Sequence, residues 1–120
     1  MRLGALTFDA ADPQVAATFW GRLLDRNPRP ARLLPSAWVL EPDGDELVWL
    51  FLGVPEPKTA KNRCHPDLHT ATHDADVAKS VELGATVVAE HAEAGRWTVL
   101  HDPEGNEFCV VEDLDGESGA

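Results

Sequence analysis

The chain has 120 residues, and its 10 Lys and Arg residues against 21 Asp and Glu residues give a formal net charge of −11 at pH 7. A chain of this length, 43% hydrophobic, is expected to form one domain with an ordinary apolar core. The acidic balance argues against nucleic-acid and anionic-membrane partners, because phosphate binding needs clustered Lys and Arg. No apolar run is long enough to span a membrane and no secretory signal is recognisable, so a cytoplasmic protein with free thiols at Cys64 and Cys109 is expected.

The first half of the chain predicts a strand, a helix and three further strands. A strand is expected over 3–9, and Asp12-Pro13 then supplies a helix cap followed by a residue that suits the first turn. The helix over 13–25 carries apolar residues at the spacing of a buried stripe: Val15, Ala16, Phe19, Trp20, Leu23 and Leu24. Strands are predicted over 32–34, 37–41 and 46–54. The register of the last strand stays open, so Trp49 faces either the helix or the opposite side.

The second half repeats this order after a linker over 55–63. A strand is predicted over 64–70, a helix over 75–83 ended by Gly84, and strands over 86–90, 96–101 and 107–112. Residues 113–120 form an acidic tail that is expected to be flexible. The chain thus predicts an α+β fold of two βαβββ modules, about 3–54 and 64–112. One helix would cover one face of each curved mixed sheet, and the opposite faces would form a cup for a small molecule.

The strand over 64–70 carries the residues best suited to chemistry. His65, Asp67 and His69 alternate along it and therefore share one polar face. His65 is a candidate general base near neutral pH. His65 and Asp67 could share a metal ion only if neighbouring strands added further ligands. The alternative interpretation is a solvated, hydrogen-bonded polar face.

The strand over 107–112 offers a thiol and a carboxylate. Phe108 and Val110 are expected beneath the helix, which would aim Cys109 and Glu107 into the cup and leave Cys64 on the buried face. The two thiols are not expected to form a disulfide because their Cβ vectors diverge. A buried thiol in apolar surroundings is usually inert, so neither cysteine is expected to act as a nucleophile.

Aromatic and basic residues could contribute to ligand binding. Trp38, Trp49 and Trp97 lie on predicted strands, and any of them could supply a flat apolar wall for a planar ligand or could instead fill the core. The linker residues Lys58, Lys61 and Arg63 either attract an anionic ligand or form a solvated surface.

Taken together, the element order and a set of short motifs resemble the glyoxalase/bleomycin resistance/dioxygenase (vicinal oxygen chelate) superfamily, most closely its small bacterial glyoxalase-like branch. The resemblance covers about residues 3–112. The motifs in chain order are Asp12-Pro13, Phe19-Trp20, Val54-Pro55-Glu56-Pro57-Lys58, Lys61-Asn62-Arg63-Cys64-His65-Pro66-Asp67-Leu68, Gly84-Ala85 and Asp102-Pro103-Glu104-Gly105-Asn106-Glu107-Phe108.

The resemblance implies a homodimer whose curved sheets enclose a substrate pocket. Enzymes of this superfamily hold a divalent metal there, which binds two adjacent substrate oxygens and stabilises an enolate or activates dioxygen. Their metal ligands come from the first, fourth, fifth and eighth strands. These positions correspond here to Ala5, Leu52 or a neighbour, His65 and Cys109, of which only His65 is a usual ligand. The usual four-ligand site therefore cannot form.

We accordingly expect a protein without a cofactor that sequesters or senses an apolar or aromatic ligand through Ala5, Trp38, Trp49, Leu52, His65, Asp67, Trp97 and Cys109. One alternative is a lyase, isomerase or dioxygenase that uses an unusual metal set, such as a zinc-like ion held by His65, Asp67 and Cys109. A second is a metal-independent enzyme with His65 as general base. A third is a module that binds only a protein partner.

Overall fold

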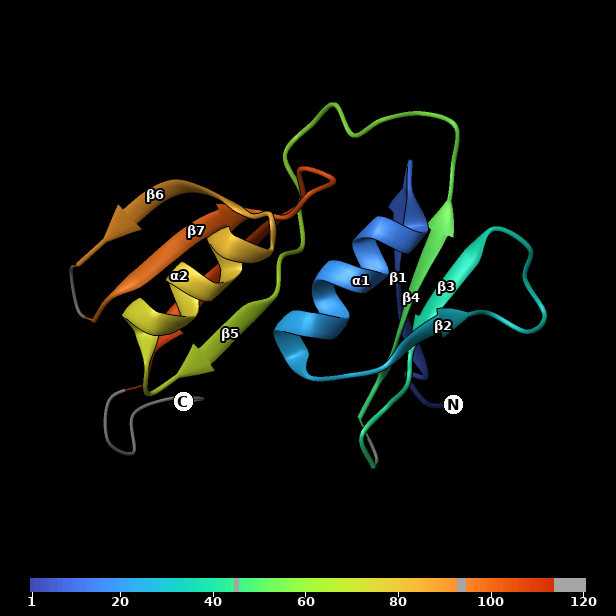
Figure 1. Ribbon diagram of the computed structural model, residues 1–120, viewed down its shortest axis with the longest axis horizontal. Helices are drawn as coiled ribbons and strands as arrows, with labels where there is room; N and C mark the ends of the chain where they lie inside the picture. The colour runs from blue at the N-terminus through green and yellow to red at the C-terminus, as the bar shows by residue number, and fades with distance from the viewer. Residues whose placement is uncertain (45, 93–94, 114–120) are drawn as a thin grey trace. The chain divides into compact units, whose positions relative to one another are not determined.

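The computed structural model describes residues 1–44, 46–92 and 95–113, and the chain divides into two compact units, Met1–Lys58 and Thr59–Ala120. Each unit contains one strand, one helix and then three strands, and in each a single helix lies along one face of its own four-stranded sheet (Figure 1). The predicted α+β fold with two βαβββ modules is therefore confirmed. The acidic tail predicted over 113–120 lies, apart from Asp113, outside the described residues.

The first unit forms a mixed sheet in the order β1-β4-β3-β2, with β1 parallel to β4 and the other pairs antiparallel. Its elements are β1 (Ala5–Ala10), α1 (Pro13–Leu24), β2 (Pro28–Pro30), β3 (Ala37–Leu40) and β4 (Val48–Gly53). Helix α1 begins where expected because the Asp12 Oδ1 atom accepts the Val15 N–H at 3.2 Å and Pro13 occupies the first turn. It ends at Asp25, whose left-handed φ of 55° stops the helix.

The core of the first unit fixes the register that the sequence left open. Trp20 on α1 is 1% exposed, and its ring lies 5.1 Å from that of Trp49 on β4. Trp49 therefore points toward the helix, as does the fully buried Phe51 two residues later. The prediction that Val15 belongs to the buried stripe is wrong, since this residue is 47% exposed in the first turn of the helix.

The strand predicted over 32–34 is also misplaced. The extended segment is β2, Pro28–Pro30, which pairs with β3 at the edge of the sheet. An edge strand tolerates proline because only one side of its backbone needs donors. Pro28 and Pro30 therefore begin and end the strand that follows helix α1.

The second unit forms a sheet in the order β5-β8-β7-β6, again with one parallel pair, β5 and β8. Its elements are β5 (Asp67–Thr70), α2 (His73–Leu83), β6 (Thr86–His91), β7 (Trp97–His101) and β8 (Glu107–Glu112). Helix α2 begins two residues earlier than predicted and is followed by Gly84 at φ 124°, a conformation that favours glycine. Phe108, Leu100 and Val110 are at most 1% exposed and form the core of this unit.

The turn between β7 and β8 sets the register of the strand that carries Cys109. The buried Asp102 side chain accepts the backbone N–H groups of Glu104 and Asn106 at 2.9 and 2.8 Å. This capped turn matches the predicted one, and it places His101 directly opposite Glu107.

Strand β5 is shorter than predicted. It begins at Asp67, so Cys64 and His65 lie in the non-strand segment that leads into the sheet. The expected burial of Cys64 is wrong, because this residue is exposed and Cys109 is the buried thiol. Strand alternation does not apply to a residue that precedes the strand. Within the described residues, no helix combines the length and the hydropathy needed to cross a membrane.

Candidate functional site

The second sheet has one face covered by α2 and one that we call the helix-free face of the second unit. Phe108 and Val110 are buried toward the helix, so the alternate residues Glu107 and Cys109 belong to the helix-free face. Cys109 pairs in register with Asp67 on β5, which places both side chains on that face. The predicted orientation of Glu107 and Cys109 is therefore confirmed.

His65, Asp67 and Cys109 form a cluster on this face. One ligand-type atom from each residue, an imidazole nitrogen, a carboxylate oxygen and the thiol sulfur, lies within 4.8 Å of the other two. The His65 Nδ1 atom is 3.2 Å from Asp67 Oδ1, and both side chains are about half exposed. A carboxylate at Nδ1 holds the imidazole in the tautomer whose Nε2 can accept a proton.

The Cys109 thiol is held in its protonated form. Burial first, and then the charge and hydrogen bond of Asp67, raise the pKa of Cys109 from its ordinary 9.0 to about 11, against the opposing effect of the Lys61 charge. Because the thiolate is the nucleophilic form, this environment disfavours nucleophilic catalysis by Cys109 at neutral pH.

Glu107 anchors the segment that precedes β5. Its buried carboxylate accepts the backbone N–H of Asn62 at 2.8 Å, and its other oxygen lies 3.5 Å from His101 Nε2. This contact ties the segment that carries His65 to strand β8. Glu107 lies on the predicted face. Its partner His101 was not predicted, although the turn expected over 102–105 would place the two residues opposite each other across the hairpin.

The three candidate tryptophans do not share one environment. Trp97 lies on the helix-free face of the second unit, where its ring stacks on His91 at 4.7 Å and 16°. Trp49 packs against α1, and Trp38 pairs with Phe51 and so faces the helix as well. Trp38 lines a separate cavity of about 450 Å³ together with residues from the start of α1 and the end of β4. Of the three, Trp97 alone lies on the face opposite its own helix.

In the first unit, the positions that correspond to metal ligands carry no donor side chains. Leu52 and Val48 alternate with the helix-facing Trp49 on β4, and Ala5 pairs in register with Val48. Ala5 and Leu52 therefore lie on the helix-free face of the first unit, but the side chain of neither offers an oxygen, nitrogen or sulfur atom. The residues present do not fit the four-ligand divalent site that the resemblance implies.

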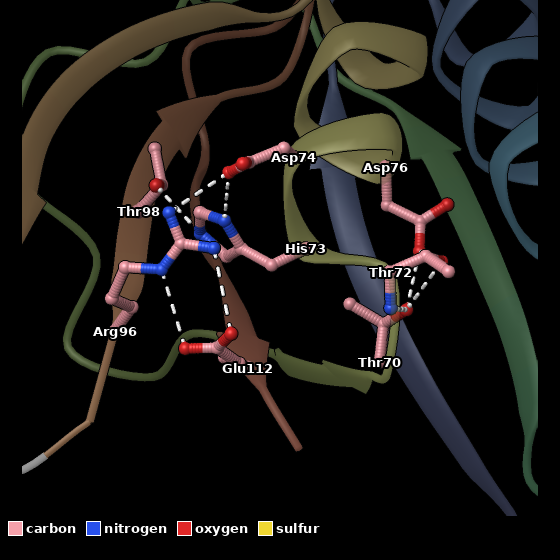
Figure 2. A network of polar contacts seen from close by, with 8 residues as sticks. All are labelled: Thr70, Thr72, His73, Asp74, Asp76, Arg96, Thr98 and Glu112. Atoms are coloured by element: carbon pink, nitrogen blue, oxygen red, sulfur yellow. Dashed lines mark hydrogen bonds and ion pairs between the residues drawn. The ribbon is translucent and has the colours of Figure 1, made fainter. Parts of the chain in front are cut away.

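A second polar network, which the sequence analysis missed, lies on the opposite face of the second sheet, at the start of α2 (Figure 2). The buried His73 places Nδ1 2.9 Å from Asp74 Oδ1 and Nε2 2.9 Å from Thr98 Oγ1. Arg96 contacts Asp74 at 3.0 Å and spans both oxygens of Glu112. The His73 hydrogen bond and the Arg96 charge hold the pKa of Asp74 below its usual value.

The same network also contains the hydrogen bonds that hold the segment between β5 and α2. Thr70 and Thr72 both donate their hydroxyls to Asp76, and the Thr70 hydroxyl accepts the Thr72 backbone N–H at 3.0 Å. Asp74 and Asp76 also lie in the first turn of α2, where negative charge complements the helix dipole. We assign this network a structural role, because it joins α2 to β5, β7 and β8.

Comparison with known proteins identifies the family. Residues 5–111 match the family described as a glyoxalase-like domain. No significant match was found among curated proteins.

Solved structures share the fold at low sequence identity. A glyoxalase/bleomycin resistance protein/dioxygenase family enzyme from Burkholderia phytofirmans is 19% identical with a TM-score of 0.76, over 95% of this chain and all of that one. A fosfomycin resistance protein from Mesorhizobium loti is 18% identical with a TM-score of 0.70, over 99% and 98% of the two chains. An antibiotic binding protein from Streptomyces is 18% identical with a TM-score of 0.69, over 95% and 97%. By its sequence match, the chain belongs to the glyoxalase-like domain family, and it has the fold of solved glyoxalase/bleomycin resistance/dioxygenase proteins.

Proposed function

We propose that this protein binds an apolar or aromatic small molecule and does so without the four-ligand divalent metal of the superfamily's enzymes. The observation that carries this proposal is the helix-free face of the first unit. Val48, Leu50 and Leu52 alternate there as half-buried side chains, and no helix among the described residues of their unit lies over them. Apolar side chains left on the uncovered face of a sheet are typical of a ligand or partner surface.

The second unit has an aromatic surface of its own. Trp97, stacked on His91, offers a flat ring for a planar ligand, and His65 and Asp67 offer polar contacts that could orient it. The antibiotic binding protein from Streptomyces has the same fold, which supports a ligand-binding role without defining the ligand. We also propose that the protein is cytoplasmic and that it forms a homodimer. Light scattering after gel filtration would test the homodimer by its molar mass.

The proposal is tested by quenching of tryptophan fluorescence in protein treated with a chelator and then freed of it. The compounds are bleomycin, fosfomycin and a set of planar aromatic antibiotics. We expect at least one compound to quench saturably, Trp97→Phe to remove most of that signal, and the control Trp38→Phe to retain it. For a compound held by the apolar face of the first unit, Leu52→Asp should weaken binding, because it places a charge on that face. Quenching by none of the compounds would contradict the proposal and favour a module that binds a protein partner.

A second candidate function rests on the 3.2 Å contact between His65 Nδ1 and Asp67 Oδ1. With Asp67 accepting the Nδ1 proton, His65 Nε2 could remove a proton from a carbon next to a carbonyl group, as a metal-independent isomerase or lyase requires. His65→Ala should then abolish turnover, and Asp67→Asn should reduce it. A protein that only sequesters its ligand would lose little affinity in either variant.

A further inference from the structure

The His65, Asp67 and Cys109 cluster has the composition of a site for a soft metal ion. We propose that these three residues form a three-ligand site for a thiophilic cation such as Zn²⁺ or Cd²⁺. The site differs from the superfamily's usual one in that Asp67 occupies none of its four ligand positions. All three donors also come from the second unit.

The backbone brings the three donors together. Asp67 and Cys109 are register partners on the parallel strands β5 and β8, so their side chains emerge side by side on one face. His65 lies two residues before Asp67, in the segment that Glu107 holds through the Asn62 N–H. The cluster therefore depends on a strand pairing and on one buried side-chain contact.

The distances suit tetrahedral coordination after small rotations. Zinc bonds of about 2.3 Å to sulfur and 2.0–2.1 Å to nitrogen or oxygen place neighbouring donors roughly 3.3–3.6 Å apart. The donors here lie within 4.8 Å of one another, and the exposed side chains of His65 and Asp67 have room to move toward the buried Cys109. Three protein ligands leave the fourth position free for water or an added molecule.

The donor types also select the kind of ion. A thiolate and an imidazole prefer zinc, cadmium and similar soft ions, whereas magnesium and manganese prefer oxygen ligands. One carboxylate among the three donors gives such hard ions little to bind. The proposed site should therefore bind zinc and cadmium in preference to magnesium and manganese.

The test is titration of metal-depleted full-length protein, without a polyhistidine tag, with CdCl₂ and ZnCl₂. Cadmium binding is followed by the ultraviolet thiolate-to-cadmium charge-transfer band and zinc binding by calorimetry. We expect one ion per chain, and no saturable binding of MgCl₂ or MnCl₂ at the same concentrations. Cys109→Ser should remove the cadmium band, whereas His65→Ala and Asp67→Asn should weaken binding at least about 10-fold, since even outer contacts of a metal site contribute 10-fold or more.

Two control variants match the test residues. Cys64→Ser removes the exposed thiol, and His69→Ala removes an exposed histidine that contacts Asp113 and lies outside the cluster. Both should bind cadmium as the unchanged protein does. Equal binding by Asp67→Asn, loss of the band in Cys64→Ser, or saturable binding of manganese would each overturn the proposal.

A further measurement keeps the proposal testable if Cys109→Ser fails to fold. In the unchanged protein, zinc should protect Cys109 but not Cys64 from a thiol reagent, as peptide mass spectrometry would report. Protection of neither residue, or of Cys64 alone, would refute the site. These experiments use no organic ligand, so their outcome is independent of the proposed ligand binding.

Discussion

The protonated thiol of Cys109 allows a quantitative test of the cluster geometry. A pKa of about 11 rather than 9.0 lowers the thiolate fraction at pH 8 about 100-fold. A more basic thiolate is also more nucleophilic in disulfide exchange, by about 10-fold for this difference, so the net slowing from the pKa alone is about 10-fold. The burial of Cys109 should slow the reaction further.

The assay uses the Cys64→Ser variant, in which Cys109 is the one remaining thiol, and a coloured aromatic disulfide reagent at pH 8. We expect Cys109 to react at least about 10-fold more slowly in the folded protein than in urea. Adding Asp67→Asn should speed the reaction in the folded state, because the Asp67 charge and hydrogen bond contribute to the raised pKa. Equal rates in folded and unfolded protein, or no effect of Asp67→Asn, would refute the reasoning.

Three further predictions concern stability, each measured by urea unfolding. Phe51→Ala should cost about 3–5 kcal/mol because the ring is fully buried, whereas Leu33→Ala, at a side chain that is 93% exposed, should change stability by less than about 0.5 kcal/mol. Asp102→Ala should cost about 1–3 kcal/mol, because it leaves two turn N–H groups without their acceptor. Raising the pH from 9 toward 11 should lower stability, since unfolded protein loses the Cys109 proton first, and Cys109→Ser should reduce that loss.

The parts of the fold that were predicted correctly depend on neighbouring residues. Asp12-Pro13 starts α1, Gly84 follows α2, and the Asp102 turn precedes β8, because each signal acts within a few residues of the chain. The misplaced strand concerns pairing between distant segments. Strand β2 exists at Pro28–Pro30 because β3 offers it a partner, which no local pattern around these prolines indicates.

The residues of the candidate site were likewise predicted in part. Strand alternation correctly placed Glu107 and Cys109 opposite the helix, and correctly grouped Asp67 with them. The grouping of His65 with Asp67 and Cys109 was also predicted, but His65 was expected inside the strand and lies instead in the segment before β5, which the Glu107 contact with Asn62 holds. The direction in which Trp49 points was open, since it depends on a strand register that Trp20 packing settles.

The central claim is that ligand binding does not need the superfamily's metal. Its most direct test is to compare the affinity for a quenching compound in chelator-treated protein with that after addition of Mn²⁺ or Mg²⁺, the oxygen-preferring ions that the His65, Asp67 and Cys109 cluster should not bind. We predict the same dissociation constant in all three conditions, within about twofold, because Ala5 and Leu52 offer no donor atoms. Binding that appears only after one of these ions is added would contradict the account.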